Sequence, residues 1–131
     1  MKKIIFGFLA SIITLSFISH SMADDIKIGV ILGFTGPIES LTPTMASSAE
    51  MAMKEATDSG LLLDGATVSS VRADSTCVDA GAAVSAAERL VTSDDVSAIM
   101  GADCSGVTTA IANNVAVPNG VTMISPSATS P

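Results

Sequence analysis

Short apolar segments alternate with longer segments of helical spacing along this sequence. Residues 26–32 (IKIGVIL) are almost continuously apolar, which predicts a strand buried on both faces. Residues 45–59 repeat apolar side chains at helical spacing, with Thr44 as the expected N-cap and Gly60 as the stop. The alternation continues with strands expected over 67–71, 96–100 and 121–124, and helices over 79–92 and 105–117. This order, with short connections, predicts an α/β fold: a doubly wound parallel sheet with flanking helices.

Residues 1–23 have the three parts of a secretory signal peptide. MKK is positively charged, an apolar core follows over residues 4–18, and Ser21-Met22-Ala23 is a small-x-small cleavage site. The core is shorter than the roughly 20 apolar residues that a membrane-spanning helix needs. We therefore expect cleavage after Ala23 and an exported protein whose domain is residues 24–131. An uncleaved membrane anchor is the alternative.

Cleavage would remove the only histidine of the chain, His20. Without histidine, Ser-His and Cys-His catalysis and His-ligated metal sites are excluded, so we expect neither an enzyme nor a metal site. All 13 acidic residues remain, against the basic residues Lys27, Lys54, Arg72 and Arg89. A chain this acidic is not expected to bind nucleic acid through a basic patch.

The two cysteines, Cys77 and Cys104, have two interpretations. In an exported domain, two cysteines most simply form one disulfide. Such a bridge would stabilise the fold by roughly 3–4 kcal/mol, because it restricts the unfolded chain. The alternative is a free catalytic thiol, which would lack a histidine partner here.

Ligands of open parallel sheets bind beyond the carboxyl ends of the strands. Three polar loops lie there in this arrangement, over residues 33–37, 103–106 and 125–130. Ser105 begins a helix, where its hydroxyl and the free N–H groups of the first turn suit a carboxylate. Either Ser105 only caps its helix, or it caps the helix and also binds a ligand. The Ser/Thr-rich third loop adds hydroxyls and carbonyls that suit an ammonium, so the pair of loops would recognise an α-amino acid.

Four segments together carry a resemblance to a known family. They are ADDIKIGVILGFTGP, CVDAGAAVSAAERLV, GADCSG and ISPSATSP, in this order and spacing. They resemble the N-terminal lobe of the branched-chain amino-acid-type (leucine-binding-like) periplasmic binding proteins, the substrate-binding subunits of ABC importers with the type I two-lobe fold. The resemblance implies a periplasmic protein with no cofactor, of which this chain is an incomplete N-terminal ligand-binding lobe. It also implies a disulfide between Cys77 and Cys104.

The resemblance assigns roles to individual residues as well. Ser105 would bind the α-carboxylate of the ligand through its hydroxyl and backbone N–H. Thr129 would help to bind the carboxylate and the ammonium, and the backbone carbonyl of Ser127 would accept from the ammonium. Leu41 stands near the place where family members often carry an aromatic residue over the ligand. Because Leu41 is not aromatic, the sequence leaves open which ligand side chain the protein prefers.

The mechanism implied by the resemblance is hinge closure. A small ligand, an amino acid or an amide, binds one lobe, and the second lobe closes over it. The closed form then docks on the membrane permease of the transporter. The second lobe would also supply an acidic partner for the ligand's ammonium.

Three other functions remain as alternatives. The same lobe serves as the ligand-binding domain of membrane receptors and sensors, and a secreted scaffold without a ligand is also compatible with the sequence. A dinucleotide-binding enzyme fragment would use Gly29, Gly33 and Gly36 as its phosphate loop, but their spacing is GxxxGxxG rather than GxGxxG. The acidic residue of such enzymes is expected about 20 residues further on, and Asp74 lies well beyond that distance.

Overall fold

The structure is a computed structural model that describes residues 25–130. The expected signal peptide and its cleavage site after Ala23 lie outside the described residues and stay predictions. Among the described residues, no helix combines the length and the apolar character that crossing a membrane requires.

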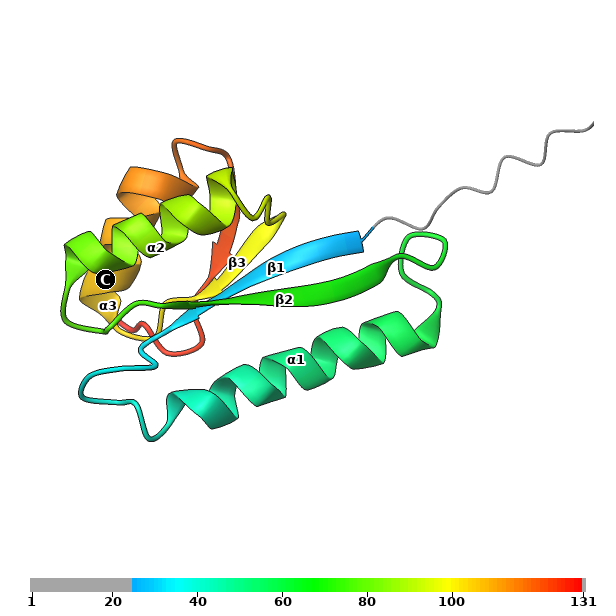
Figure 1. The fold of residues 1–131 in the computed structure, drawn as a ribbon, viewed down its shortest axis with the longest axis horizontal. Coiled ribbons are helices and arrows are strands. Elements are labelled where there is room, and N and C mark those ends of the chain that lie inside the picture. Colours follow the sequence, from blue (N-terminus) through cyan, green and yellow to red (C-terminus); the bar gives the residue numbers. More distant parts are fainter. Residues whose placement is uncertain (1–24, 131) are drawn as a thin grey trace, which may run out of the picture.

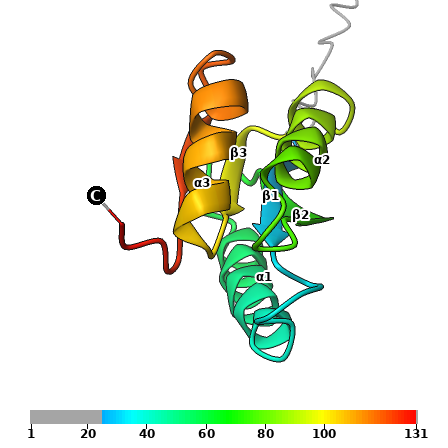
Figure 2. The ribbon, with the colours of Figure 1, turned by 90° about the vertical axis from the view of Figure 1, so that its left-hand side faces the viewer.

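The described residues form one parallel sheet with helices on both faces. The strands are paired in the order β2-β1-β3-β4, and each pair is parallel. Helix α1 covers one face, while α2 and α3 cover the other (Figures 1 and 2). The predicted doubly wound α/β fold is therefore confirmed. The elements are β1 (Asp25–Leu32), α1 (Thr42–Ser59), β2 (Thr67–Asp74), α2 (Ala80–Thr92), β3 (Ala98–Gly101), α3 (Ser105–Ile111), the π-helical turn η1 (Ala112–Ala116) and β4 (Thr122–Ile124).

Strand β1 lies inside the sheet, and its last four residues, 29–32, are buried between the helices of the two faces. Val30 and Leu32 pack with Ala46 of α1 in one core cluster. Ile31, which points to the opposite face, packs in a second cluster with Leu90 of α2 and residues of α3. Successive side chains of a strand point to opposite faces, so one continuous apolar segment serves both clusters.

Helix α1 begins three residues earlier than expected. Its N-cap is Leu41, which makes no side-chain capping bond, and Pro43 lies in the first turn. Proline is favoured there because the first N–H groups of a helix have no intrahelical partner. Thr44 is therefore inside the helix, and its assignment as N-cap was wrong. The expected stop is confirmed, because Gly60 forms the C-cap with a left-handed φ of 64°.

Several other boundaries differ from the sequence expectation. Strand β2 continues to Asp74 because its last residues pair in register with the buried end of β1, Asp74 opposite Leu32. Strand β3 begins at Ala98, because the N–H of Val96 donates to the Leu90 carbonyl in a turn. The third helix changes to π-helical geometry after Ile111.

The sheet face beside α1 is only partly covered. Helix α1 packs on β1 and β2, whereas β3 and β4 leave an open apolar hollow of about 250 Å³ on the sheet. Ile124 of β4 is 68% exposed. The residues lining the hollow are Ile28, Ala98, Ile99, Met100, Thr122 and Ile124.

Candidate functional site

The sheet has a topological switch point between β1 and β3. The chain runs from β1 to β2 through α1 on one face, then returns through α2 to β3 on the other side of β1. The connection after β1 leads to α1 on one face, and the connection after β3 leads to α3 on the other face, so they diverge at the ends of two neighbouring strands, where open α/β sheets bind ligands. The connections that follow the strand ends are residues 33–41, 75–79, 102–104 and 125–130.

The segment after β4 is bound to the start of α3. The hydroxyl oxygen of Ser105 accepts hydrogen bonds from the N–H of Thr129 at 3.1 Å and of Ser130 at 3.2 Å. The Ser127 hydroxyl donates to the backbone carbonyl of Asp103 at 2.8 Å. In Figure 2 this red C-terminal segment runs past the first turn of α3. The structure therefore brings together three of the four residues predicted to bind a ligand.

Ser105 does not cap its helix, so the capping part of both interpretations was wrong. The N-cap of α3 is Cys104, without a side-chain capping bond, and Ser105 is the first helical residue. A serine hydroxyl has two acceptor lone pairs and one O–H donor. The N–H groups of Thr129 and Ser130 occupy the acceptor side, so the O–H of Ser105 is left to donate.

Leu41, the fourth predicted residue, stands apart from the other three. It is the N-cap of α1 and its side chain is 60% exposed. Within residues 25–130, no hydrogen bond or core cluster joins Leu41 to Ser105, Ser127 or Thr129. Its role over a ligand stays a prediction.

The predicted disulfide is present. Cys77, in the connection after β2, is bonded to Cys104, 27 residues further along the chain. The bond fixes the residue that directly precedes Ser105 to the neighbouring loop. Among the described residues no cysteine is free, so the catalytic-thiol alternative is excluded for this pair.

A buried carboxylate was missed by the sequence reasoning. Asp103 follows β3 and is only 4% exposed. Its Oδ2 accepts from the N–H of Gly33 at 2.9 Å, and its Oδ1 accepts from the Ser75 hydroxyl at 3.2 Å. The sequence does show an acidic residue between a buried strand and a cysteine. Its hydrogen-bond partners, however, are remote in sequence.

A second carboxylate holds the connection after β1. The hydroxyl of Thr35 donates to Oδ2 of Asp74 at 2.6 Å, and the N–H groups of Thr35 and Thr76 donate to Oδ1. Partial burial alone would raise the pKa of Asp74, but these hydrogen bonds outweigh it and lower the pKa below its ordinary value. The negative form of Asp74 thus keeps the loop of Thr35 attached to the end of β2.

Two of the glycines considered for a phosphate loop, Gly29 and Gly36, allow close packing instead. Gly29 lies within β1, where an added Cβ would come within 2.9 Å of the Leu90 side chain. It therefore allows α2 to pack closely on the strand. Gly36 has a φ of 96°, and a Cβ there would lie 2.5 Å from the Thr76 carbonyl. Glycine is therefore required at this position for the close approach of the loops after β1 and β2. Helix α1 begins only at Thr42, rather than directly after the glycines as in a dinucleotide-binding loop.

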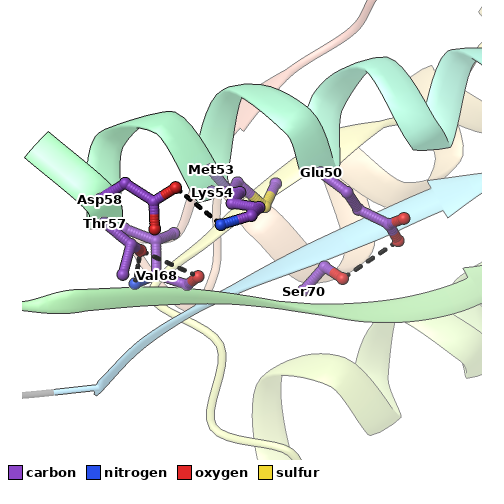
Figure 3. Close-up of a pocket in the computed structure, with 7 residues that line it drawn as sticks. All are labelled: Glu50, Met53, Lys54, Thr57, Asp58, Val68 and Ser70. Carbon is purple, nitrogen blue, oxygen red and sulfur yellow. Dashed lines mark hydrogen bonds and ion pairs between the residues drawn. The ribbon is translucent and has the colours of Figure 1, made fainter.

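A polar groove of about 430 Å³ lies between α1 and β2 (Figure 3). Its charged groups are paired: Lys54 with Asp58 at 2.6 Å, and Glu50 with Ser70 at 3.1 Å and with Arg72 outside the groove. The hydrogen bond from Arg72 lowers the pKa of Glu50. The groove borders the first half of β2, away from the strand ends that carry the candidate site. Its lining residues are Glu50, Met53, Lys54, Thr57, Asp58, Val68 and Ser70.

Comparisons with known proteins agree on one family. A family model described as periplasmic binding protein matches residues 25–131. The leucine-specific-binding protein of Salmonella typhimurium is 30% identical over 131 residues, which is 100% of this chain and 34% of the relative. The Leu/Ile/Val-binding protein of Escherichia coli K12 is 31% identical over 123 residues, 94% of this chain and 32% of the relative. The chain thus spans about a third of the length of the curated relatives that it matches.

Solved structures show the same likeness. The branched-chain amino acid transporter substrate-binding protein of Streptococcus pneumoniae, in complex with isoleucine, has a TM-score of 0.73 and 34% identity. The match covers 82% of this chain and 30% of that protein. A leucine-binding protein of Thermotoga maritima has a TM-score of 0.69 and 30% identity, over 80% of this chain and 28% of that protein.

Proposed function

This chain belongs to the periplasmic binding protein family, and we propose that it forms the N-terminal ligand-binding lobe of the substrate-binding subunit of an ABC importer. The ligand is a free amino acid with an aliphatic side chain. The names of the relatives support this class, since they are leucine- and Leu/Ile/Val-binding proteins. The protein works in the periplasm and performs no covalent chemistry.

The observation that carries the proposal is the convergence of hydrogen-bond donors at Ser105. Its O–H group is left to donate, and the N–H groups of Thr129 and Ser130 point at the same oxygen. A ligand carboxylate placed there would accept from the Ser105 hydroxyl and could take over the N–H of Thr129. Hydrogen bonds to a charged acceptor are about twice as strong as neutral ones, so this exchange favours a carboxylate.

The ammonium group is assigned to the same loop. The Ser127 carbonyl and the Thr129 hydroxyl would accept from it, which places both charged ends of an α-amino acid between α3 and residues 125–130. The hydrogen bond from the Ser127 hydroxyl to the Asp103 carbonyl holds this loop in place. Leu41 would contact the aliphatic side chain of the ligand.

The other lobe completes the mechanism. It closes over the bound ligand, excludes water and supplies an acidic partner for the ammonium, and the closed form docks on the permease. Closure buries the ligand's polar groups, so a single lobe is expected to bind much more weakly than the full-length gene product.

Calorimetric titration of the full-length gene product tests this proposal. L-Leucine, L-isoleucine and L-valine are compared with leucinamide, which lacks the carboxylate, and N-acetyl-leucine, which lacks the ammonium. We expect at least one free amino acid to bind and both blocked analogues to bind about 100-fold more weakly, because each loses hydrogen bonds to a charged group. Equal binding of the blocked analogues, or no binding of any of the three amino acids, would contradict the proposal.

A further inference from the structure

We propose that Asp103 is a positioning residue, whose buried carboxylate joins the connections at the strand ends and so presets the ligand-contacting geometry of Ser105 and residues 125–130. The inference rests on the proposed function and deepens it, because Asp103 itself is not assigned a contact with the ligand.

Asp103 has a partner in every connection at this edge of the sheet. Its carboxylate accepts from the Gly33 N–H after β1 and the Ser75 hydroxyl after β2, at 2.9 and 3.2 Å. Its own turn is fixed by the N–H of Cys104, which donates to Oδ1 at 3.1 Å. Its backbone carbonyl accepts from the Ser127 hydroxyl after β4 at 2.8 Å. One residue thus connects four loops that are separated by up to 70 positions in sequence.

The carboxylate is held by neutral donors alone. Asp103 is 4% exposed, and the four basic side chains of the described residues have other partners. A buried carboxylate is tolerated only when its oxygens are hydrogen-bonded, so the surrounding N–H and O–H groups are held in fixed positions around it. The basic side chains and their partners are Lys27 with the Asp94 carbonyl, Lys54 with Asp58, Arg72 with Glu50, and Arg89 with Asp94.

The consequence for the site follows from the chain path. Ser105 is two residues beyond Asp103, and the Asp103–Cys104 turn sets where the Ser105 hydroxyl meets the N–H groups of Thr129 and Ser130. The Ser127 bond holds the other half of the site to the same residue. Weakening the hydrogen bonds of Asp103 should therefore displace both Ser105 and residues 125–130, while the core of the sheet stays packed.

The test compares Asp103→Asn with Leu90→Ala in the full-length gene product. Asparagine keeps the shape of the side chain but turns one acceptor oxygen into an NH₂ donor that faces another donor. Leu90 is a fully buried residue of α2 that packs in the core, and no hydrogen bond joins it to residues 125–130, so its variant reports general destabilisation. The readouts are the Kd for L-leucine, L-isoleucine and L-valine, the melting temperature, and hydrogen exchange of a peptide that covers residues 125–130.

We expect Asp103→Asn to raise the Kd by about tenfold or more and to accelerate exchange in residues 125–130. Leu90→Ala should lower the melting temperature at least as much and leave the Kd within about twofold. The inference is overturned if Asp103→Asn keeps both the Kd and the exchange rate, or if Leu90→Ala weakens binding equally.

Two further measurements keep the inference testable if Asp103→Asn does not fold or if the wild-type protein does not bind these amino acids. If Asp103→Asn does not fold, Ser75→Ala removes one of the donors to the carboxylate and should produce the same changes at smaller size; unchanged exchange in that variant overturns the inference. If the wild-type protein binds none of the three amino acids, the proposed function fails. Exchange in residues 125–130 of the Asp103→Asn variant then decides the positioning role alone.

Discussion

Replacing Ser105 and Thr129 together by alanine should weaken the binding of L-leucine by at least about 100-fold in the full-length gene product. The double variant removes the hydroxyl that donates to the ligand carboxylate and the hydroxyl that accepts from its ammonium. Hydrogen bonds to charged groups contribute about 1.5–3 kcal/mol each, so losing two of them corresponds to a factor of about 100 or more. The backbone N–H of Thr129 remains, so weak binding should persist. Isothermal titration calorimetry measures the change.

The matched control is Ser85→Ala with Thr109→Ala. Both residues are exposed on α2 and α3, and the pair removes the same two hydroxyl types away from the loops. This control should bind L-leucine with wild-type affinity. If the double variant at positions 105 and 129 binds as tightly as the control, the assignment of the carboxylate to these loops is wrong.

Removing the Cys77–Cys104 disulfide should lower the free energy of unfolding by about 3–4 kcal/mol. The bond closes a loop with a sequence separation of 27, and the chain-entropy model gives this cost for a loop of that size. The Cys77→Ser, Cys104→Ser variant should therefore unfold at a markedly lower urea concentration than the oxidised protein, measured by circular dichroism.

Treatment with a reductant distinguishes the effect of losing the disulfide from the effect of replacing the cysteine side chains. Reduction should shift the urea midpoint of the wild type toward that of the double serine variant and should not move the midpoint of the variant. A wild type whose midpoint is the same with and without reductant would show that the bond does not form or does not restrict the unfolded chain.

The elements of the sheet could be predicted because their signals are local. The continuous apolar segment at residues 26–32 indicates two-sided burial, and β1 indeed supplies both core clusters. The helix expected over residues 79–92 begins at Ala80, within one residue of the expectation, because Asp79 is its N-cap and accepts from the Ala82 N–H. Periodicity and capping chemistry are contained in a few neighbouring residues, so a single sequence reveals them.

The start of α1 and the capping role of Ser105 were mispredicted, although α3 does begin at Ser105 as expected. Thr44 has the right chemistry for an N-cap, but the helix begins at Thr42, whose buried hydroxyl donates to the Gly33 carbonyl at 3.0 Å. A tertiary contact therefore determines this start. Ser105 was misassigned for a similar reason, since its hydroxyl is engaged by residues 129 and 130 rather than by its own helix.

The arrangement of the site was only partly accessible from sequence. Ser105, Ser127 and Thr129 came from strand-end position and from the resemblance, and the structure places them together. The role of Asp103 could not be predicted from the sequence, because its partners Gly33 and Ser75 lie 70 and 28 positions away. Polar loops have no periodicity, so their mutual contacts appear only once the strands are paired.

A crystal structure of the full-length gene product with L-isoleucine tests the central claim most directly. We expect a ligand carboxylate oxygen within about 2.7–3.2 Å of the Ser105 hydroxyl and of the Thr129 nitrogen, with the ammonium at the Ser127 carbonyl. An isoleucine bound elsewhere, for example in the groove between α1 and β2, or one whose carboxylate contacts neither Ser105 nor Thr129, would contradict it.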